Sequence, residues 1–189
     1  MREKVKKSDG VLLLKSLSLE IGEAACVIET DACPDGMAFW YPAFRKGFAA
    51  AMPQGTPATQ IIFYKALAVL SALMDTHSIF PSQSKIVVFT DNLTTVAMFN
   101  SLSALPEYNH ILKEAVDILL EGGHDLRVLH IAGKLNLVVD AHSRFKFMKA
   151  LSVQPGLTIH NFEPFWHLDC QQLPPLLLPP QVALRDNMC

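Results

Sequence analysis

Three aspartates stand where predicted elements end or meet, and carboxylates gathered at one point can bind divalent cations. Asp31 ends an apolar run, Asp91 ends another, and Asp140 lies in a helical pattern near residue 140. Clustered carboxylates repel one another unless a cation neutralises them. Mg²⁺ suits such a cluster because it prefers oxygen ligands. Two such ions about 4 Å apart can activate water and stabilise the leaving oxygen in phosphodiester cleavage.

Each aspartate also has an ordinary structural explanation. An aspartate that follows a strand is common in turns. Asp91 could cap the helix that begins after it, and Asp140 could be a solvated helix residue. The order of the three along the chain is more specific than any one of them, because all three occur on elements that could converge.

The pattern of apolar residues predicts the elements that would position these carboxylates. β-branched runs and turn residues indicate strands, and longer 3.6-residue periodicity indicates helices. The predicted strands are 25–32, 37–42, 85–91 and 125–133, with a weak short strand within 43–59, and the predicted helices are 60–75, 92–102, 109–123 and 136–150. This order predicts an α/β domain with a mixed sheet. If its first and fourth strands are neighbours, Asp31 and Asp91 point at one spot.

Length and charge limit what the chain can do alone. It has 189 residues, half of them hydrophobic, and a formal net charge of -2. Such a chain has no bulk attraction for nucleic acid or anionic membranes, so any nucleic-acid contact must be local or supplied by a partner domain. We predict an N-terminal extension (1–22), one domain (23–150) and a proline-rich tail or linker (151–189) that contains the segment LPPLLLPP.

Cysteine usage and hydropathy predict an intracellular protein, cytoplasmic or nuclear. The four cysteines show neither C-x-x-C nor zinc-site spacing and are interpreted as reduced thiols. The longest apolar stretch, about 61–74, contains Lys65 and is too short to span a bilayer. The basic N-terminus lacks the apolar core of a signal peptide, so we expect no membrane association.

Four separated segments resemble one known family. They are ETDACPDGMAFWYP, FYKALAVLSAL, VVFTDNLTTVAMFNSLSALPEYNHIL and DLRVLHIAGKLNLVVDAHSR. In this order they resemble the ribonuclease H domain of retroelement polyproteins, especially fungal elements, including those that carry a tyrosine recombinase. The resemblance implies a ribonuclease H-like fold with a central mixed five-stranded sheet flanked by helices. It also implies two Mg²⁺ or Mn²⁺ ions, hydrolysis of the RNA strand of RNA–DNA hybrids, an adjacent reverse transcriptase domain, and a monomeric state.

Residue by residue, the resemblance assigns three of four catalytic carboxylates. Asp31, Asp91 and Asp140 match the first, third and fourth, and they would be the metal ligands. The second position, a glutamate in the family, is Lys65 here. A charged ammonium has no lone pair to donate and repels a divalent cation. We therefore expect weak metal affinity and impaired catalysis.

Residues beside the carboxylates are candidate nucleic-acid contacts. Arg144 begins the alternating basic and aromatic run RFKFMK, which could touch a phosphate backbone or could simply favour a helix C-terminus. Asn92 could contact nucleic acid or cap the following helix. His142 stands where the family usually has leucine, and we expect a half-exposed, functionally neutral position.

Two hypotheses of different classes follow. The chain is either a retroelement ribonuclease H impaired at Lys65, or an inactive domain of that fold that binds nucleic acid or a protein partner. A small-molecule enzyme finds no support, because phosphate-binding glycine loops, nucleophile elbows and zinc motifs are absent from the sequence.

Overall fold

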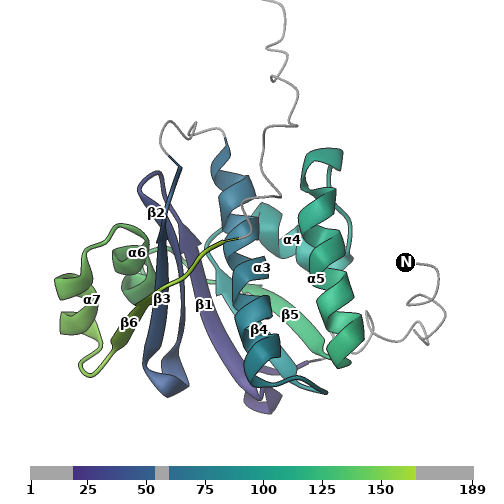
Figure 1. Cartoon of the computed structure of the whole chain (residues 1–189), viewed down its shortest axis with the longest axis horizontal. Coiled ribbons are helices and arrows are strands. Elements are labelled where there is room, and N and C mark those ends of the chain that lie inside the picture. The colour runs from purple at the N-terminus through teal and green to yellow at the C-terminus, as the bar shows by residue number, and fades with distance from the viewer. Residues whose placement is uncertain (1–18, 54–59, 165–189) are drawn as a thin grey trace, which may run out of the picture.

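The computed structural model describes residues 19–53 and 60–164. They form a six-stranded mixed sheet flanked by helices on both faces (Figure 1). The strands are β1 (Cys26–Ala32), β2 (Gly36–Tyr41), β3 (Lys46–Ala51), β4 (Lys85–Thr90), β5 (Asp125–His130) and β6 (Thr158–Asn161). The main helices are α3 (Ile61–Ile79), α4 (Leu93–Ser101), α5 (Asn109–Gly122), α6 (Leu137–Ser143) and α7 (Phe147–Val153). The α/β class and the central mixed sheet flanked by helices, both expected from the sequence, are confirmed.

The sheet order is β5-β4-β1-β2-β3-β6, so β1 and β4 are neighbours, which is the condition under which the sequence places Asp31 and Asp91 together. β1 pairs antiparallel with β2 and parallel with β4, and β4 pairs parallel with β5. Parallel neighbours end at the same edge of a sheet. This register therefore brings the ends of β1 and β4, where Asp31 and Asp91 lie, to one edge.

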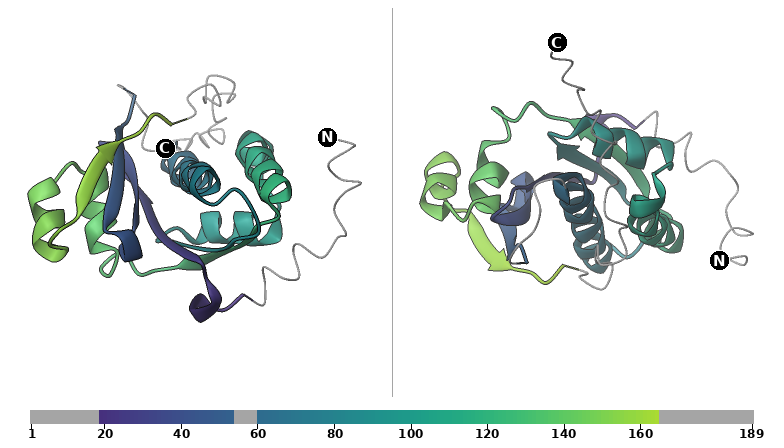
Figure 2. Two further views of the ribbon diagram at one scale, coloured as in Figure 1. Left: turned by 60° about the horizontal axis from the view of Figure 1, so that its bottom comes forward. Right: turned by 90° about the horizontal axis from the view of Figure 1, so that it is seen from above.

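Two hydrophobic clusters cover the two faces of the sheet. The larger joins α3, α4 and α5 to one face and includes the fully buried Ile28, Leu67, Leu70 and Ile86. The smaller joins α6 and α7 to β2 and β3 on the other face (Figure 2). Because side chains alternate across a strand, Ile28 of β1 packs under α3. Asp31, three residues later, faces the side of α6.

The nearly continuous apolar surface of α3 explains its place in the core. Eleven of its nineteen residues are buried, including Phe63, Ala66 and Leu73. Lys65, one turn into this helix, is an exception in an otherwise apolar segment. A helix that is apolar nearly all round is stable only when it is covered on several sides, and α5 and the sheet supply that cover. None of the helices in the described ranges is long and apolar enough to cross a membrane.

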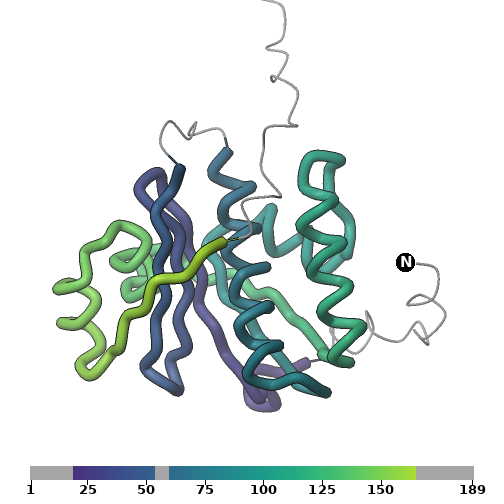
Figure 3. Tube along the Cα trace, viewed as in Figure 1, coloured from purple at the N-terminus to yellow at the C-terminus, as the bar shows by residue number. Residues whose placement is uncertain are grey.

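Two features differ from the sequence predictions. The helix predicted over 136–150 is two helices, because Phe145 takes a left-handed backbone conformation with φ 54°. No glycine marks that turn, so the pattern of the sequence did not reveal it. The sheet has six strands where five were predicted, because β6 pairs parallel with the edge strand β3 (Figure 3). The folded part of the chain thus continues past residue 150, where we predicted the domain to end.

The β6 segment was missed because it is short, exposed and mostly polar. Its four residues, TIHN, carry little of the alternation that identifies a strand. Phe162, directly after it, packs against the ring of Phe39 at 5.0 Å between centroids. The proline-rich segment 173–180 lies outside the described residues.

Candidate functional site

The carboxylates of Asp31 and Asp91 meet at the common edge of β1 and β4, and the Lys65 ammonium lies between them. Lys65 Nζ is 2.6 Å from Asp31 Oδ1 and 2.5 Å from Asp91 Oδ1. Only 5% of the Asp31 side chain and 11% of the Lys65 side chain are exposed, against 30% for Asp91. The three residues therefore form a largely buried ion cluster in which one cation is shared by two carboxylates.

The elements explain this geometry. Asp31 is the second-last residue of β1 and pairs with Ala38 of β2, and Asp91 follows the last residue of β4. Lys65 lies in the second turn of α3, which crosses the same end of the sheet. A lysine stem is long enough to run along the apolar helix surface and present its ammonium beyond it.

Burial and charge act against each other in this cluster. Burial lowers the pKa of Lys65, but Asp31 and Asp91 outweigh that effect and raise the pKa above its ordinary value. Lys65 is therefore an ammonium at neutral pH. Burial raises the pKa of Asp31, and the opposing influences of Lys65 and Ser143 only partly offset it. An ion cluster of this kind depends on every partner, because a lone buried charge is costly.

Helix α6 brings further groups to Asp31. The Ser143 hydroxyl donates to Asp31 Oδ2 at 2.8 Å, so both oxygens of this carboxylate accept hydrogen bonds. The buried amide of Asn136, just before α6, donates to the carbonyl oxygen of Thr30 at 3.3 Å. Ser143 and Asn136 both lie in the segment DLRVLHIAGKLNLVVDAHSR, but the sequence alone assigned a role to neither residue. The three-residue spacing of Asp140 and Ser143, which puts them on one helix face, was the available signal.

Asp140 has a different cationic partner. Its Oδ1 accepts from Arg144 Nε at 2.8 Å, across one turn of α6. That hydrogen bond raises the pKa of Arg144, and the charge of Asp31 contributes in the same direction. Asp140 therefore lies on the helix that contacts Asp31 through Ser143, and its own charge is balanced by Arg144.

The two candidate nucleic-acid contacts have local partners. Asn92 Oδ1 accepts from the backbone N–H of Thr95 at 2.8 Å, which makes Asn92 the N-cap of α4. Capping was the alternative recognised in the sequence. Arg144 keeps 41% of its side chain exposed beside Asp140. For both residues, contact with nucleic acid stays a prediction.

His142 is buried, although the sequence suggested a half-exposed position. Its side chain is fully covered, and Nδ1 lies 3.1 Å from the carbonyl oxygen of Val138. The other ring nitrogen, Nε2, has no hydrogen-bond partner and faces Gly47 of β3. Burial lowers the pKa of His142. This histidine is a neutral core residue between α6 and the sheet.

The two metal ions implied by the resemblance do not fit these residues. The space between Asp31 and Asp91 holds an ammonium, and a second ion would need a carboxylate where Lys65 stands. Within residues 19–53 and 60–164, no group of three or more His, Cys, Asp or Glu side chains is placed to hold a metal ion. The four-carboxylate set implied for two ions is therefore incomplete in the described part of the chain.

Comparison with known proteins gives a fold but no sequence family. No family model matches the chain, and no curated protein matches it significantly. The crystal structure of LC11-RNase H1 in complex with an RNA/DNA hybrid is similar, with 17% identity and a TM-score of 0.54. That similarity covers 66% of this chain and 98% of the other. A second LC11-RNase H1 structure, of the protein isolated from compost by a metagenomic approach, has 18% identity, a TM-score of 0.53, and 66% and 96% coverage. The chain therefore has the ribonuclease H fold.

Proposed function

We propose that this chain is a nucleic-acid-binding domain that engages RNA–DNA hybrids without cleaving them. The observation that carries this proposal is the Lys65 ammonium between Asp31 and Asp91. It occupies the point at which metal-dependent cleavage by this fold would need a divalent cation. Binding depends on the shape and charge of the surface around the site, and these do not require the missing carboxylate.

The distribution of charge supports binding beside the site. Residues 134–149 contain four cationic side chains and one aspartate, a formal net charge of +3 in a chain of net charge -2. All four are exposed: Lys134, Lys146 and Lys149, and also Arg144, which lies beside Asp140. Local cationic side chains of this kind bind phosphate backbones without reading sequence.

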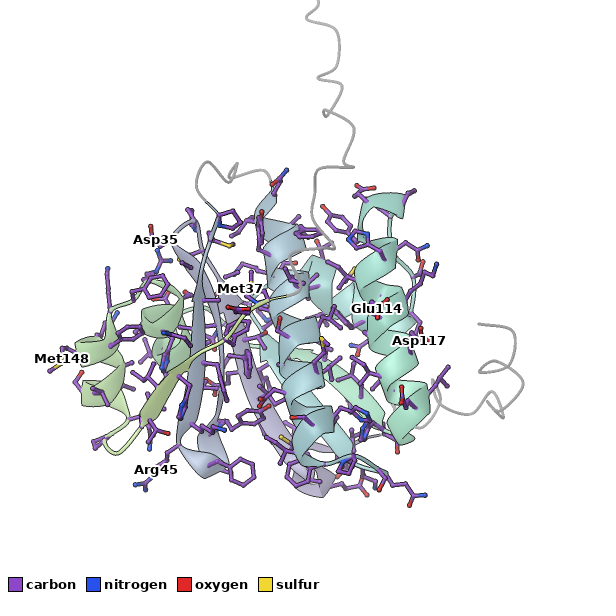
Figure 4. The ribbon with its side chains drawn as sticks, in the orientation of Figure 1. Asp35, Met37, Arg45, Glu114, Asp117 and Met148 are labelled. Carbon is purple, nitrogen blue, oxygen red and sulfur yellow. The ribbon has the colours of Figure 1, made fainter. Side chains whose placement is uncertain are left out.

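Helix α5, on the other side of the molecule, is acidic. Figure 4 labels Glu114 and Asp117 on α5, at the opposite side of the molecule from Met148 on α7. Helix α5 has one lysine and three acidic residues, a net charge of -2. A phosphate backbone would be repelled by α5 and attracted to the 134–149 segment. This asymmetry favours one orientation of a bound duplex.

The resemblance to retroelement polyproteins extends the proposal to partners. We propose that the domain acts inside cells beside a reverse transcriptase domain, which would supply most of the grip on the hybrid. The modest charge of the chain is consistent with such dependence. The alternative function, ribonuclease H activity at a reduced rate, is favoured by the retention of Asp31, Asp91 and Asp140.

The test measures binding and cleavage separately on a labelled RNA–DNA hybrid, in Mg²⁺ and in Mn²⁺. We expect the unaltered chain to bind the hybrid in a salt-dependent manner and to leave it intact. Lys65→Glu is expected to gain cleavage, and the Lys65→Glu, Asp31→Asn double variant is expected to lose it again. Cleavage by the unaltered chain that Asp31→Asn abolishes would contradict the proposal and favour the reduced-activity alternative.

If neither the unaltered chain nor Lys65→Glu binds or cleaves, the assay is repeated with a reverse transcriptase domain fused upstream. Binding that appears only in the fusion supports dependence on that partner. Absence of binding in the fusion would overturn the proposal.

A further inference from the structure

Every candidate catalytic carboxylate in this chain forms an ion pair with a cation of the chain itself. Lys65 forms ion pairs with Asp31 and Asp91, and Arg144 forms an ion pair with Asp140. The first of these clusters is the more buried, with 11% or less of Lys65 and Asp31 exposed. The strongest ion cluster of the site is therefore the one in which an ammonium contacts both strand-end carboxylates.

The position of the ammonium is that of a bound cation. Two carboxylate oxygens, one from each strand, lie 2.5 to 2.6 Å from Lys65 Nζ. Oxygens lie at roughly 2.3–2.6 Å from Ca²⁺ and roughly 2.0–2.1 Å from Mg²⁺ in proteins. With the ammonium removed, a small movement of either carboxylate would bring the same two oxygens to ligand distance of one divalent ion.

The charges of the site lead to the same conclusion. Asp31, Asp91, Asp140, Lys65 and Arg144 together carry a formal charge of -1. Without the Lys65 charge the total is -2, and the carboxylates of Asp31 and Asp91, which now share one ammonium, would face each other without a cation between them. One divalent ion would neutralise that charge, whereas a buried, uncompensated pair is strongly unfavourable.

We infer that Lys65 is a tethered substitute for a divalent cation, and that removing its charge converts Asp31 and Asp91 into a divalent-cation site. The unaltered chain would then fold without a metal ion. This inference concerns the ion cluster alone and does not depend on whether the chain binds a hybrid. Its test therefore contains no nucleic acid, so the two proposals fail separately.

The test compares thermal unfolding in excess EDTA and in millimolar Mn²⁺, with bound Mn²⁺ counted by electron paramagnetic resonance. The unaltered chain is expected to melt at the same temperature in both and to bind no stoichiometric Mn²⁺. Lys65→Met keeps the apolar stem and removes the charge. We expect it to melt about 10 °C lower in EDTA, to bind one Mn²⁺, and to recover at least half of the loss when Mn²⁺ is present.

Three further variants make the result specific. Lys65→Glu, which lowers the charge further, should bind Mn²⁺ more tightly than Lys65→Met. Adding Asp31→Asn to Lys65→Met should abolish Mn²⁺ binding and relieve part of the destabilisation in EDTA. Lys113→Met, on the exposed surface of α5, should behave like the unaltered chain in both conditions.

Three outcomes would overturn the inference. One is stoichiometric Mn²⁺ binding with a raised melting temperature in the unaltered chain. Another is a Lys65→Met variant that is as stable as the unaltered chain in EDTA and whose melting temperature does not change when Mn²⁺ is added. The last is a Lys65→Met variant that stays unfolded both in EDTA and in Mn²⁺. A variant that is unfolded in EDTA and folds when Mn²⁺ is added would support the inference.

Discussion

At the scale of single residues, Lys65 decides the chemistry of the site. A glutamate at this position would add negative charge and attract metal ions, whereas lysine brings a positive charge to the same point. Its ammonium contacts Asp31 and Asp91 within 2.6 Å. A lysine in place of the expected glutamate therefore changes an expected cation-binding centre into an ion cluster held by the chain's own ammonium.

Arg144 provides the residue-scale prediction about binding. Arg144→Gln should weaken hybrid binding and reduce the slope of log affinity against log salt by about 0.9, the value for one lost phosphate contact. The measurement is a salt titration of binding by fluorescence anisotropy. Lys113→Gln, on the acidic helix α5, is the matched control and should leave the slope unchanged.

An unchanged slope for Arg144→Gln would show that this guanidinium serves only Asp140. The pair is partly exposed, at 41% and 32%, and such ion pairs contribute little to stability. The variant should therefore fold normally, and a change in its affinity reports on contact with nucleic acid.

At the scale of elements, the packing of α6 on the sheet depends on two residues that fit each other. His142 lies over Gly47, and a Cβ atom at Gly47 would be 2.7 Å from His142 Nε2. Only a residue without a side chain on β3 lets a buried imidazole come this close. The same helix carries Ser143 and Asp140, so this contact also sets how α6 meets Asp31.

A double-mutant cycle tests this contact. Gly47→Ala should lower the free energy of unfolding by about 1–3 kcal/mol, because extra volume in a packed core forces side chains to move. In a His142→Ala background the same change should cost less or become stabilising, giving a coupling energy of about 1 kcal/mol or more. Urea unfolding measures all four proteins.

Gly22→Ala is the control for this cycle, because a Cβ there would meet no atom within 4 Å. It should change stability little in either background. Equal costs of Gly47→Ala with and without His142 would contradict the proposed fit between helix and strand.

At the scale of the whole molecule, the sheet continues into a region that the sequence suggested was a tail. β6 adds a parallel strand beside β3, and Phe162 reaches the core aromatic Phe39. The backbone groups on that edge of β3 are paired by β6. The structural unit therefore includes residues well past 150.

Truncation tests this boundary. The reference is a chain that ends at residue 164 and therefore keeps β6 and Phe162. A chain that ends at residue 154 lacks β6, the buried Leu157 and the half-buried Phe162 ring. We expect it to lose about 2–5 kcal/mol or to fail to fold, because loss of a buried leucine side chain alone costs that much. Circular dichroism and thermal melts compare the two, and equal stability would place the boundary before β6.

Much of this molecule was determined by local patterns in the sequence. The alternation and length of apolar runs identified β1, β4 and β5, and the long apolar periodicity identified α3. The strand ends fixed the positions of Asp31 and Asp91, and their meeting required only that β1 and β4 be neighbours, which the sheet confirms. These features could be predicted because backbone hydrogen bonding and side-chain burial impose periods of two and 3.6 residues.

The tertiary structure decided the rest, because it depends on contacts between residues far apart in the chain. The sequence showed that Lys65 replaces a carboxylate, but only packing of α3 across the sheet edge shows one ammonium touching two carboxylates. Burial of His142, the turn at Phe145 and the pairing of β6 follow from how α6 and β3 fit together. Local periodicity carries no information about such distances, since they are set by which surfaces pack and how closely.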